Sequence, residues 1–207
     1  SKMNNLGKFI TLEGVDGAGK TTHIEFIKNY LSDLGIHYVM TREPGGTLLG
    51  ERLRDILLHD EMTPETETML MFAARNEHID KVIRPNLLSG AVVISDRFTD
   101  ASYAYQAGGK GVKEEKIDIL KNWVQGSLQP DLTFLFDLPV EISMERLKKT
   151  RNLDKFEREN KNFHENIRKK YLMLANACPE RFVVLDSQKS IEEIQCQIKL
   201  KLDEALK

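Results

Sequence analysis

The feature that most restricts how this chain can fold is a glycine-rich segment that directly follows its first apolar run. Residues 14–21 match the pattern G-x-x-x-x-G-K-[ST]. Glycines let successive backbone N–H groups converge on phosphate oxygens, and the positive end of a following helix points at the same anion. We therefore expect a strand, a phosphate-binding loop and a helix that bind ATP or GTP through Gly14, Val15, Asp16, Gly17, Ala18, Gly19, Lys20 and Thr21.

Four side chains at or near this loop carry the chemistry that such a site needs. Lys20 can reach between the β- and γ-phosphates, and the hydroxyl of Thr21 can ligate Mg²⁺. A later apolar run, Ala91–Ser95, ends in Asp96, and an acid in this position holds the metal or its water shell. Arg97, the next residue, places a guanidinium where phosphates meet.

Alternating strand and helix patterns predict an α/β fold. Five apolar, β-branched runs have helical segments between them: Phe9–Leu12, Tyr38–Thr41, Ala91–Ser95, Leu132–Phe136 and Phe182–Leu185. Several are apolar on both faces, which is typical of strands buried in a parallel sheet. We expect a three-layer sandwich with a five-stranded parallel sheet and right-handed crossovers, as in the P-loop NTPases.

One helix and one tryptophan give further expectations. A Thr-Pro pair at 63–64 marks the entrance of a helix. We expect this helix to carry Met69, Phe72 and Ala73 inward and to continue to about residue 90. Trp123, the single tryptophan, is expected to pack in the core or in a dimer interface.

Composition restricts the class of protein. The chain has 207 residues, of which 41% are hydrophobic, so we expect one folded domain over residues 1–207. Met3 is interpreted as the natural start, with Ser1 and Lys2 left from expression. Lys and Arg total 30 and Asp and Glu total 32, and this near-neutral balance gives no support to a nucleic-acid partner.

Compartment and metal content are predicted from what the sequence lacks. No apolar run approaches the ~20 residues that span a bilayer, and the N-terminus lacks the apolar core of a secretory signal. Cys178 and Cys196 form no CxxC pair, so we interpret both as reduced thiols of a cytoplasmic protein. The five histidines are scattered and predict no metal site of their own.

The segment Lys148–Lys170 is crowded with charge and holds few apolar residues. Two interpretations remain open for it. It is either a solvated helical hairpin or a mobile lid over a phosphate site, with the lid insertion at approximately 148–160.

Missing motifs and an excess of arginines indicate the kind of acceptor. N-K-x-D and L-S-G-G-Q are absent, which excludes signalling GTPases and transporter-type ATPases. Five arginines are placed near the carboxyl edge of the expected sheet: Arg42, Arg54, Arg75, Arg97 and Arg151. A monophosphate acceptor, with its second pKa of about 6, is already largely dianionic at pH 7 and needs charge cancellation rather than a strong base. This pattern favours a nucleoside-monophosphate kinase.

Five segments, in their order and spacing, resemble bacterial thymidylate kinase. They are Phe9–Thr21, Thr41–Gly46 (TREPGG), Phe72–Arg75 (FAAR), Asp96-Arg97 and Tyr105-Gln106. The resemblance extends from Phe9 to the final helix. It implies transfer of the γ-phosphoryl group of ATP to dTMP with Mg²⁺, giving ADP and dTDP for dTTP synthesis. It also implies a nucleoside-monophosphate kinase fold with a helical lid, and a homodimer.

The resemblance also assigns the residues that bind thymine and phosphate. Arg75 hydrogen-bonds the carbonyl edge of thymine, while Arg97 and Arg54 hold the dTMP phosphate. Phe72 stacks on the base. Many relatives place that aromatic residue four positions before the arginine, which is Met71 here, so both residues remain candidates.

Further roles follow from the same resemblance. Ser102 lies near the thymine ring or its water, and Tyr105 sits against the sugar at C2′. Gln106 and Glu43 face the site. Asp16 contacts the 3′-hydroxyl or takes part in the magnesium shell.

The expected catalytic arginine comes from the lid. Some relatives carry it inside the phosphate loop, but positions 15–18 contain no arginine here. The chain thus resembles the bacterial type in which Arg151 supplies it, with Lys155 as a possible substitute. Arg146, where the lid begins, is expected to stack on adenine.

Two other functions compete with this one. A deoxynucleoside kinase shares the phosphate loop and the lid arginines, and it uses a carboxylate near Glu43-Pro44 as its base. A nucleotide-binding module without chemistry lacks a second pocket. Arg75, Arg97 and Tyr105 favour the presence of that pocket.

Overall fold

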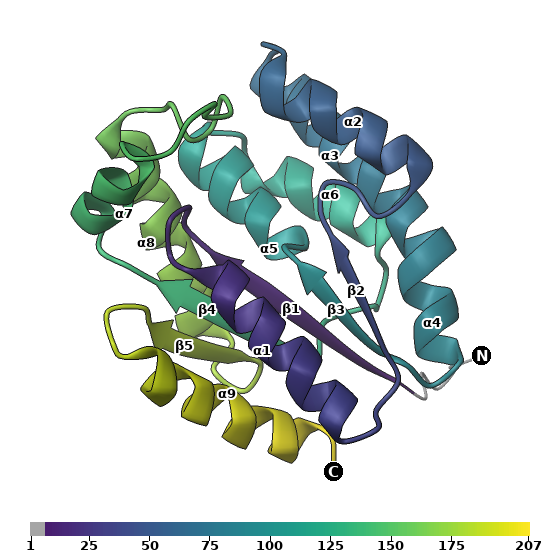
Figure 1. Ribbon diagram of the computed structural model, residues 1–207. Coiled ribbons are helices and arrows are strands. Elements are labelled where there is room, and N and C mark those ends of the chain that lie inside the picture. The colour runs from purple at the N-terminus through teal and green to yellow at the C-terminus, as the bar shows by residue number, and fades with distance from the viewer. Residues whose placement is uncertain (1–6) are drawn as a thin grey trace.

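A five-stranded parallel sheet in the order β2-β3-β1-β4-β5 runs through the centre of the molecule (Figure 1). Its strands are β1 (Lys8–Gly14), β2 (Tyr38–Arg42), β3 (Val92–Asp96), β4 (Leu132–Asp137) and β5 (Phe182–Asp186). The five predicted strands are therefore confirmed, each to within two residues at either end. This computed structural model describes residues 7–207, so the interpretation of Ser1, Lys2 and Met3 lies outside the described residues.

Helices cover both faces of the sheet, which confirms the three-layer sandwich. They are α1 (Lys20–Asp33), α2 (Leu48–His59), α3 (Pro64–His78), α4 (Arg84–Leu88), α5 (Thr99–Ser102), α6 (Glu114–Val124), α7 (Val140–Leu147), α8 (Lys161–Ala177) and α9 (Ile191–Ala205), with the π-helical segments η1 (Ile79–Ile83) and η2 (Tyr103–Gly109). Figure 1 shows α1 and α9 on one face and α3, α4, α6 and α8 on the other.

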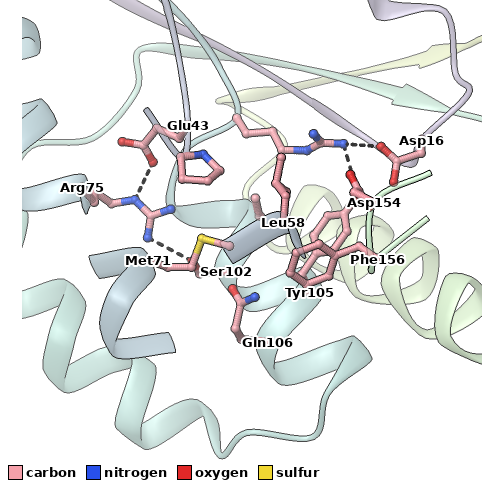
Figure 2. Close-up of a pocket in the computed structure, with 13 residues that line it drawn as sticks. Asp16, Glu43, Leu58, Met71, Arg75, Ser102, Tyr105, Gln106, Asp154 and Phe156 are labelled. Atoms are coloured by element: carbon pink, nitrogen blue, oxygen red, sulfur yellow. Dashed lines mark hydrogen bonds and ion pairs between the residues drawn. The ribbon is translucent and has the colours of Figure 1, made fainter. Parts of the chain in front are cut away.

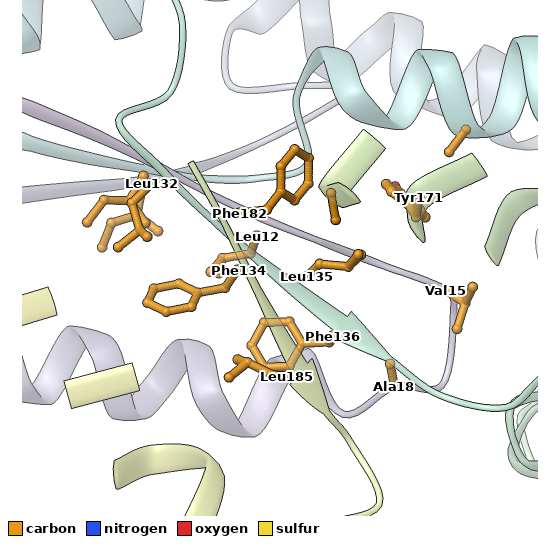
Figure 3. Packing of buried hydrophobic residues seen from close by; sticks show 14 of the residues in the cluster. Leu12, Val15, Ala18, Leu132, Phe134, Leu135, Phe136, Tyr171, Phe182 and Leu185 are labelled. Carbon is orange, nitrogen blue, oxygen red and sulfur yellow. The ribbon is translucent and has the colours of Figure 1, made fainter. Parts of the chain in front are cut away.

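Buried aromatic residues of β4 attach the glycine-rich loop to the core (Figure 3). Phe134 and Phe136, two residues apart, are fully buried and lie on the same face of the sheet, as the two-residue period of a strand requires. Val15 and Ala18 of the loop belong to the same buried cluster. A Cβ at Gly14, where φ is +149°, would lie only 2.5 Å from the carbonyl oxygen of Phe136. The close approach of these two backbones therefore requires glycine.

The register of the sheet brings the ends of three strands together. Asp96, the last residue of β3, is paired with Leu12 of β1 and with Arg42 of β2. The loops that follow β1, β2 and β3 consequently leave from one edge of the sheet. This edge is the usual position of ligand sites in open parallel sheets.

Helix α3 starts as expected but buries a different face. Thr63 caps it by accepting a hydrogen bond from the backbone N–H of Thr66 at 3.3 Å, and helical structure continues through η1 and α4 to Leu88. The prediction that Met69 and Ala73 point inward is wrong, because Met69 is 55% exposed and Ala73 is also exposed. Phe72 is buried as predicted. The buried face as a whole consists of Glu67, Thr68, Met71, Phe72, Ala74, Arg75 and His78. Four of these residues are polar or charged, so hydrophobic spacing could not identify the face.

Trp123 does not belong to the core. Its side chain is 81% exposed on α6, and Ile119, one helical turn earlier, is 66% exposed. The core interpretation of Trp123 is therefore wrong, whereas packing against a partner stays a prediction. Within residues 7–207, the structure contains no helix with the length and apolar character needed to cross a membrane.

Candidate active site

A cavity lies beside the glycine-rich loop, below the ends of β2 and β3 (Figure 2). Seven of the predicted site residues line it: Asp16, Glu43, Arg75, Arg97, Ser102, Tyr105 and Gln106. The wall also contains Pro44, Leu58, Met71, Ala101, Asp154 and Phe156. Apolar and aromatic groups thus alternate with a few charged groups, which is typical of a small-molecule site.

The loop is held open for phosphate by residues outside it. Ser143 of α7 donates a hydrogen bond to the carbonyl oxygen of Asp16 at 2.5 Å, and Arg146 donates to that of Gly17 at 2.6 Å. Because these carbonyls are occupied, the opposite side of the peptide units, with its N–H groups, is available for an anion. Arg146 is otherwise exposed, so one face of its guanidinium is open to solvent.

Lys20 and Asp96 form an ion pair at the end of the loop. The Lys20 Nζ lies 2.7 Å from Asp96 Oδ1. Burial lowers the pKa of Lys20, and the nearby charge of Arg97 lowers it further. Burial alone would raise the pKa of Asp96, but Lys20 and Arg97 outweigh burial and lower it. Asp96 is therefore ionised at neutral pH.

The residues near this ion pair fit a magnesium ion. The ionised carboxylate of Asp96 and the exposed hydroxyl of Thr21 are hard oxygen donors, which Mg²⁺ prefers. Among residues 7–207 no cluster of three His, Cys, Asp or Glu residues could hold a metal by itself. Mg²⁺ is usually held by one or two carboxylates, water and substrate phosphates, and Asp96 with Thr21 would supply two oxygen donors of this kind.

Arg97 lines the cavity and is hydrogen-bonded to two other residues of its wall. Its Nη2 donates to Asp16 Oδ1 at 3.0 Å and to the hydroxyl of Tyr105 at 3.1 Å. Burial alone would lower the pKa of Arg97, but Tyr105 and Asp16 outweigh it and raise the pKa. The buried Nε of Arg97 has no hydrogen-bond partner among the described residues. A buried cationic donor without a partner is suited to receiving an anionic ligand.

Arg54 adds positive charge beside Arg97. Its Nη1 donates to the carbonyl oxygen of Pro44 at 2.9 Å. Burial lowers the pKa of Arg54, and the neighbouring charges of Arg42 and Arg97 lower it further. Arg54 is therefore near Arg97, but it does not itself line the cavity, and Arg42 is already paired with Glu51 at 2.8 Å.

Arg75 is fixed on three sides. Its Nε donates to Glu43 Oε1 at 2.6 Å and its Nη1 to Ser102 Oγ at 3.0 Å (Figure 2). Its Nη2 donates to the carbonyl oxygen of Phe98 at 3.3 Å. An arginine carries five N–H groups, so two have no partner among the described residues, and Arg75 lines the cavity in which a ligand would bind.

The structure places Phe72 and Met71 differently from the main expectation. Phe72 does not line the cavity; its ring is buried with Tyr103 and Ile117, and the guanidinium of Arg75 lies 4.6 Å from its centre. Phe72 therefore supports Arg75. Met71, four positions before the arginine, lines the cavity in its place.

Glu43 is not available as a general base. Its Oε1 accepts from Arg75, and its Oε2 lies 2.7 Å from Nδ1 of His78. Burial alone would raise the pKa of Glu43, but Arg75 and His78 outweigh it and lower the pKa. A weakly basic carboxylate with both oxygens occupied is a poor proton acceptor, which argues against the deoxynucleoside kinase interpretation.

Glu13 lies below the site and was not expected there. Its carboxyl group accepts the backbone N–H of Phe98 at 2.8 Å and the hydroxyl of Tyr171 at 2.7 Å. Burial, with a contribution from Asp100, raises its pKa to about 8. The N–H of Phe98 directly follows Arg97, whose φ of +70° is unusual for a residue other than glycine. Glu13 thus holds the turn that aims Arg97.

The raised pKa of Glu13 predicts a pH-dependent stability. Between its unfolded value of 4.5 and about 8, the folded state binds one proton more than the unfolded state, so stability falls as pH rises through this window. Glu13→Gln should lose this dependence, and its free energy of unfolding relative to wild type should increase by up to about 1.4 kcal/mol per pH unit. Urea unfolding at pH 6 and pH 8 measures the effect. Equal pH slopes for wild type and Glu13→Gln would contradict it, and exposed Glu61→Gln is the control.

The segment between α7 and α8 is docked against the cavity. Lys155 is buried, and its Nζ lies 3.0 Å from Glu67 Oε1 and 2.8 Å from the carbonyl oxygen of Asp60. Phe156 contacts Tyr105 edge to face, with 5.8 Å between the ring centres. The helical hairpin is not observed, because residues 150–160 form turns and bends and α8 starts only at Lys161.

The structure does not bring the predicted lid cations to the loop. Arg151 is exposed and does not line the cavity. Lys155 already forms an ion pair with Glu67, so its suggested role as a substitute catalytic cation does not agree with its position.

Gln106 lines the cavity, but its amide nitrogen donates a hydrogen bond to the other oxygen of Glu67 at 2.8 Å.

Comparisons with known proteins identify the family. The model of the thymidylate kinase family matches residues 12–198. The chain is 57% identical over 192 residues to a thymidylate kinase from Methylobacillus flagellatus, covering 93% of this chain and 95% of that protein. The chain belongs to the thymidylate kinase family. It is therefore a phosphotransferase of the nucleoside-monophosphate kinase class.

Other thymidylate kinases agree with this assignment. One from Neisseria meningitidis serogroup B is 50% identical over 198 residues, covering 95% of this chain and 96% of that protein. A crystal structure of thymidylate kinase from Ehrlichia chaffeensis superposes with a TM-score of 0.78 at 32% identity, covering 95% of this chain and 98% of that one. The fold is thus a P-loop nucleoside-monophosphate kinase fold.

Several residues that build this thymidylate kinase site were not identified from the sequence. Glu13, His78, Tyr171, Asp154 and Phe156 carry no motif of their own. One signal was available, because His78 follows Arg75 by three positions and so shares its helix face. Glu13 directly precedes Gly14, but its type does not show that it supports the turn at Phe98. Tyr171, Asp154 and Phe156 approach the site from positions far along the chain, and Tyr171 is 158 residues from Glu13.

Proposed function

We propose that the protein catalyses the reaction after which its family is named, transfer of the γ-phosphoryl group of ATP to dTMP to give ADP and dTDP. The observation that carries this proposal is the position of Arg75 and Arg97 on one cavity beside the glycine-rich loop. Arg97 has a buried Nε without a partner for a phosphate, and Arg75 has two free N–H groups for a carbonyl-bearing base. A module that only binds one nucleotide has no use for this second pocket.

On the donor side, the loop from Gly14 to Thr21 binds the phosphates of ATP. Lys20 neutralises the charge that moves with the γ-phosphoryl group, and Thr21 and Asp96 would hold Mg²⁺ or its water shell. When bound there, Mg²⁺ would supply positive charge that stabilises the phosphates during transfer. Arg146 is fixed to the loop and has one open face, which supports stacking on adenine.

On the acceptor side, each end of dTMP has its own partners. Arg97 and Arg54 bind the phosphate, and Asp16 accepts the 3′-hydroxyl. Tyr105, whose hydroxyl is tied to Arg97, occupies the space beside C2′. The base lies on Met71, with Arg75 donating to its carbonyl edge and Ser102 beside it.

The reaction needs no strong base. A monophosphate is mostly dianionic at neutral pH and attacks directly once its charge repulsion is cancelled. The guanidinium groups of Arg97 and of the nearby Arg54 supply that cancellation, together with Lys20 on the donor side. Closure of residues 148–160 over the bound nucleotides would exclude water and deliver Arg151.

A panel of acceptors tests the proposal. With ATP and Mg²⁺ in a coupled ADP assay, dTMP should give the highest kcat/KM, whereas AMP, CMP, GMP and unphosphorylated thymidine should be poor acceptors. Comparable turnover of thymidine would favour the deoxynucleoside kinase alternative. Comparable turnover of AMP would reject the assignment of the base pocket.

We also propose a homodimer that covers the exposed apolar face of α6 and α3. Three large apolar side chains are exposed on these neighbouring helices, Trp123 and Ile119 of α6 and Met69 of α3. Trp123→Glu should convert the protein from dimer to monomer in sedimentation equilibrium. Leu200→Glu, on the opposite face of the sheet, is the matched control and should leave the mass unchanged.

The unpaired thiols of Cys178 and Cys196 fit a reducing compartment, which supports a location in the cytoplasm.

A further inference from the structure

His78 lies behind the base pocket and has no role in the reaction described above. It occupies the last position of α3, three residues after Arg75, and its side chain is completely buried. We propose that His78 is a positioning residue that sets the base preference of the acceptor pocket, acting through Glu43 on Arg75. This inference rests on the proposed function, because Arg75 is taken to read the base.

Two hydrogen bonds fix the ring of His78 and show which of its nitrogens contacts Glu43. Its Nδ1 lies 2.7 Å from Glu43 Oε2, and its Nε2 lies 2.6 Å from the hydroxyl oxygen of Thr41. An ionised carboxylate can only accept, so Nδ1 carries the proton and donates to Glu43. The hydroxyl of Thr41 donates to Nε2 in the neutral tautomer, which fixes the plane of the ring.

The ring is also held by the loop that follows β2. Gly46 has φ +81°, and a Cβ at this position would collide with the His78 ring and with the hydroxyl of Thr41. The loop from Glu43 to Gly46 therefore packs directly on the imidazole. His78 thus connects the loop that carries Glu43 with the helix that carries Arg75.

Through Glu43 the contact reaches Arg75. Because His78 holds Oε2, the carboxylate of Glu43 cannot turn, and its Oε1 stays 2.6 Å from Nε of Arg75. Ser102 and the ring of Phe72 hold the other edge and one face of the guanidinium. The two N–H groups left for the ligand are therefore presented in one fixed orientation.

A fixed pair of donors distinguishes bases by their edges. Thymine presents a carbonyl oxygen where cytosine presents an amino group, so donors aimed at that edge favour dTMP over dCMP. Without His78, one oxygen of the buried Glu43 loses its partner, and the carboxylate and Arg75 gain freedom to reorient. Discrimination between the two bases should then fall, while the ATP side of the site stays as it was.

The test compares His78→Leu with His78→Asn. His78→Leu should raise KM for dTMP roughly 10- to 100-fold and lower the ratio of kcat/KM for dTMP to that for dCMP, with KM for ATP near the wild-type value. In His78→Asn the amide nitrogen lies near the position of Nδ1 and can donate to Glu43, so this variant should recover most of the base ratio. His23→Leu removes another buried imidazole, from α1, and should leave the ratio unchanged.

The outcomes separate positioning from a purely structural role. An unchanged dTMP to dCMP ratio in folded His78→Leu, or equal defects in His78→Asn and His78→Leu, would overturn the inference. If His78→Leu does not fold, Thr41→Val removes the hydroxyl that holds Nε2 and should shift the same ratio in the same direction by a smaller factor. A wild-type preference for a different monophosphate would overturn the proposed function instead, and the same variants would then decide the inference on the preferred base.

Discussion

Lys20→Ala is expected to lower kcat by about 10³-fold or more while the protein stays folded. The side chain of Lys20 is 11% exposed at the end of the phosphate loop, and its Nζ lies 2.7 Å from Asp96, so its charge is partly shielded from water. A charge in such a site stabilises the moving phosphoryl group more than it would in water. Removal also leaves Asp96 without its ion-pair partner, beside the place where negative charge accumulates.

Steady-state and single-turnover rates with ATP and dTMP measure this effect. Lys28→Ala is the matched control, because Lys28 lies on the same helix and is paired only with the exposed Glu25, at 3.3 Å. Its kcat should be that of wild type. A folded Lys20→Ala enzyme with a kcat near the wild-type value would show that the phosphate loop does not act on the transferred group.

The sheet and the phosphate loop could be predicted because their signals are local. Strands β1, β3 and β4 are buried on both faces, so their sequences are mostly apolar and do not alternate with polar residues. The loop Gly14–Thr21 is a motif whose residue types follow from the geometry of phosphate binding. The buried face of α3 could not be predicted from hydrophobic spacing, because a helix that lines a site also buries polar residues.

The direct contacts of the cavity were predicted better than the residues behind them. Glu43, Arg75, Arg97 and Tyr105 belong to segments that a family resemblance can identify. His78, in contrast, acts on Glu43 from 35 positions along the chain, and nothing in the sequence shows that their side chains meet. A residue that supports a site residue can be identified only when the fold is known, because their contact depends on tertiary structure and not on sequence spacing.

Phe72 and Lys155 illustrate why a residue type alone does not assign a role. An aromatic ring near an arginine suits stacking on a base, but Phe72 packs beneath Arg75 because the helix turns its side chain away from the cavity. A lysine in a charged segment suits a lid cation, but Lys155 forms a buried ion pair with Glu67. In both cases the position of the residue in its helix or loop decides whether its side chain contacts the ligand or packs against residues that do.

Arg151→Ala is expected to lower kcat roughly 10³-fold with little change in the Kd of ATP or dTMP. The phosphate loop has no arginine of its own, and the charge that develops on the equatorial oxygens during transfer needs one. Arg151 is exposed in a segment of turns, beside Asn152 at φ +57°, and is not held by the body of the enzyme. An arginine that reaches the phosphates only when this segment closes contributes to the transition state and not to ground-state binding.

Two further variants distinguish a specific role of the Arg151 guanidinium from a general effect of positive charge. Arg151→Lys should recover only part of the rate, because an ammonium group cannot reproduce the planar fork of the guanidinium. Arg158→Ala removes an exposed arginine from the same segment and should keep the wild-type kcat. Single-turnover rates, with calorimetric Kd values on the same proteins, decide the matter. A wild-type rate for Arg151→Ala would transfer the catalytic charge to Arg146, since the amine of Lys155 is bound to Glu67 and cannot move without breaking a buried ion pair.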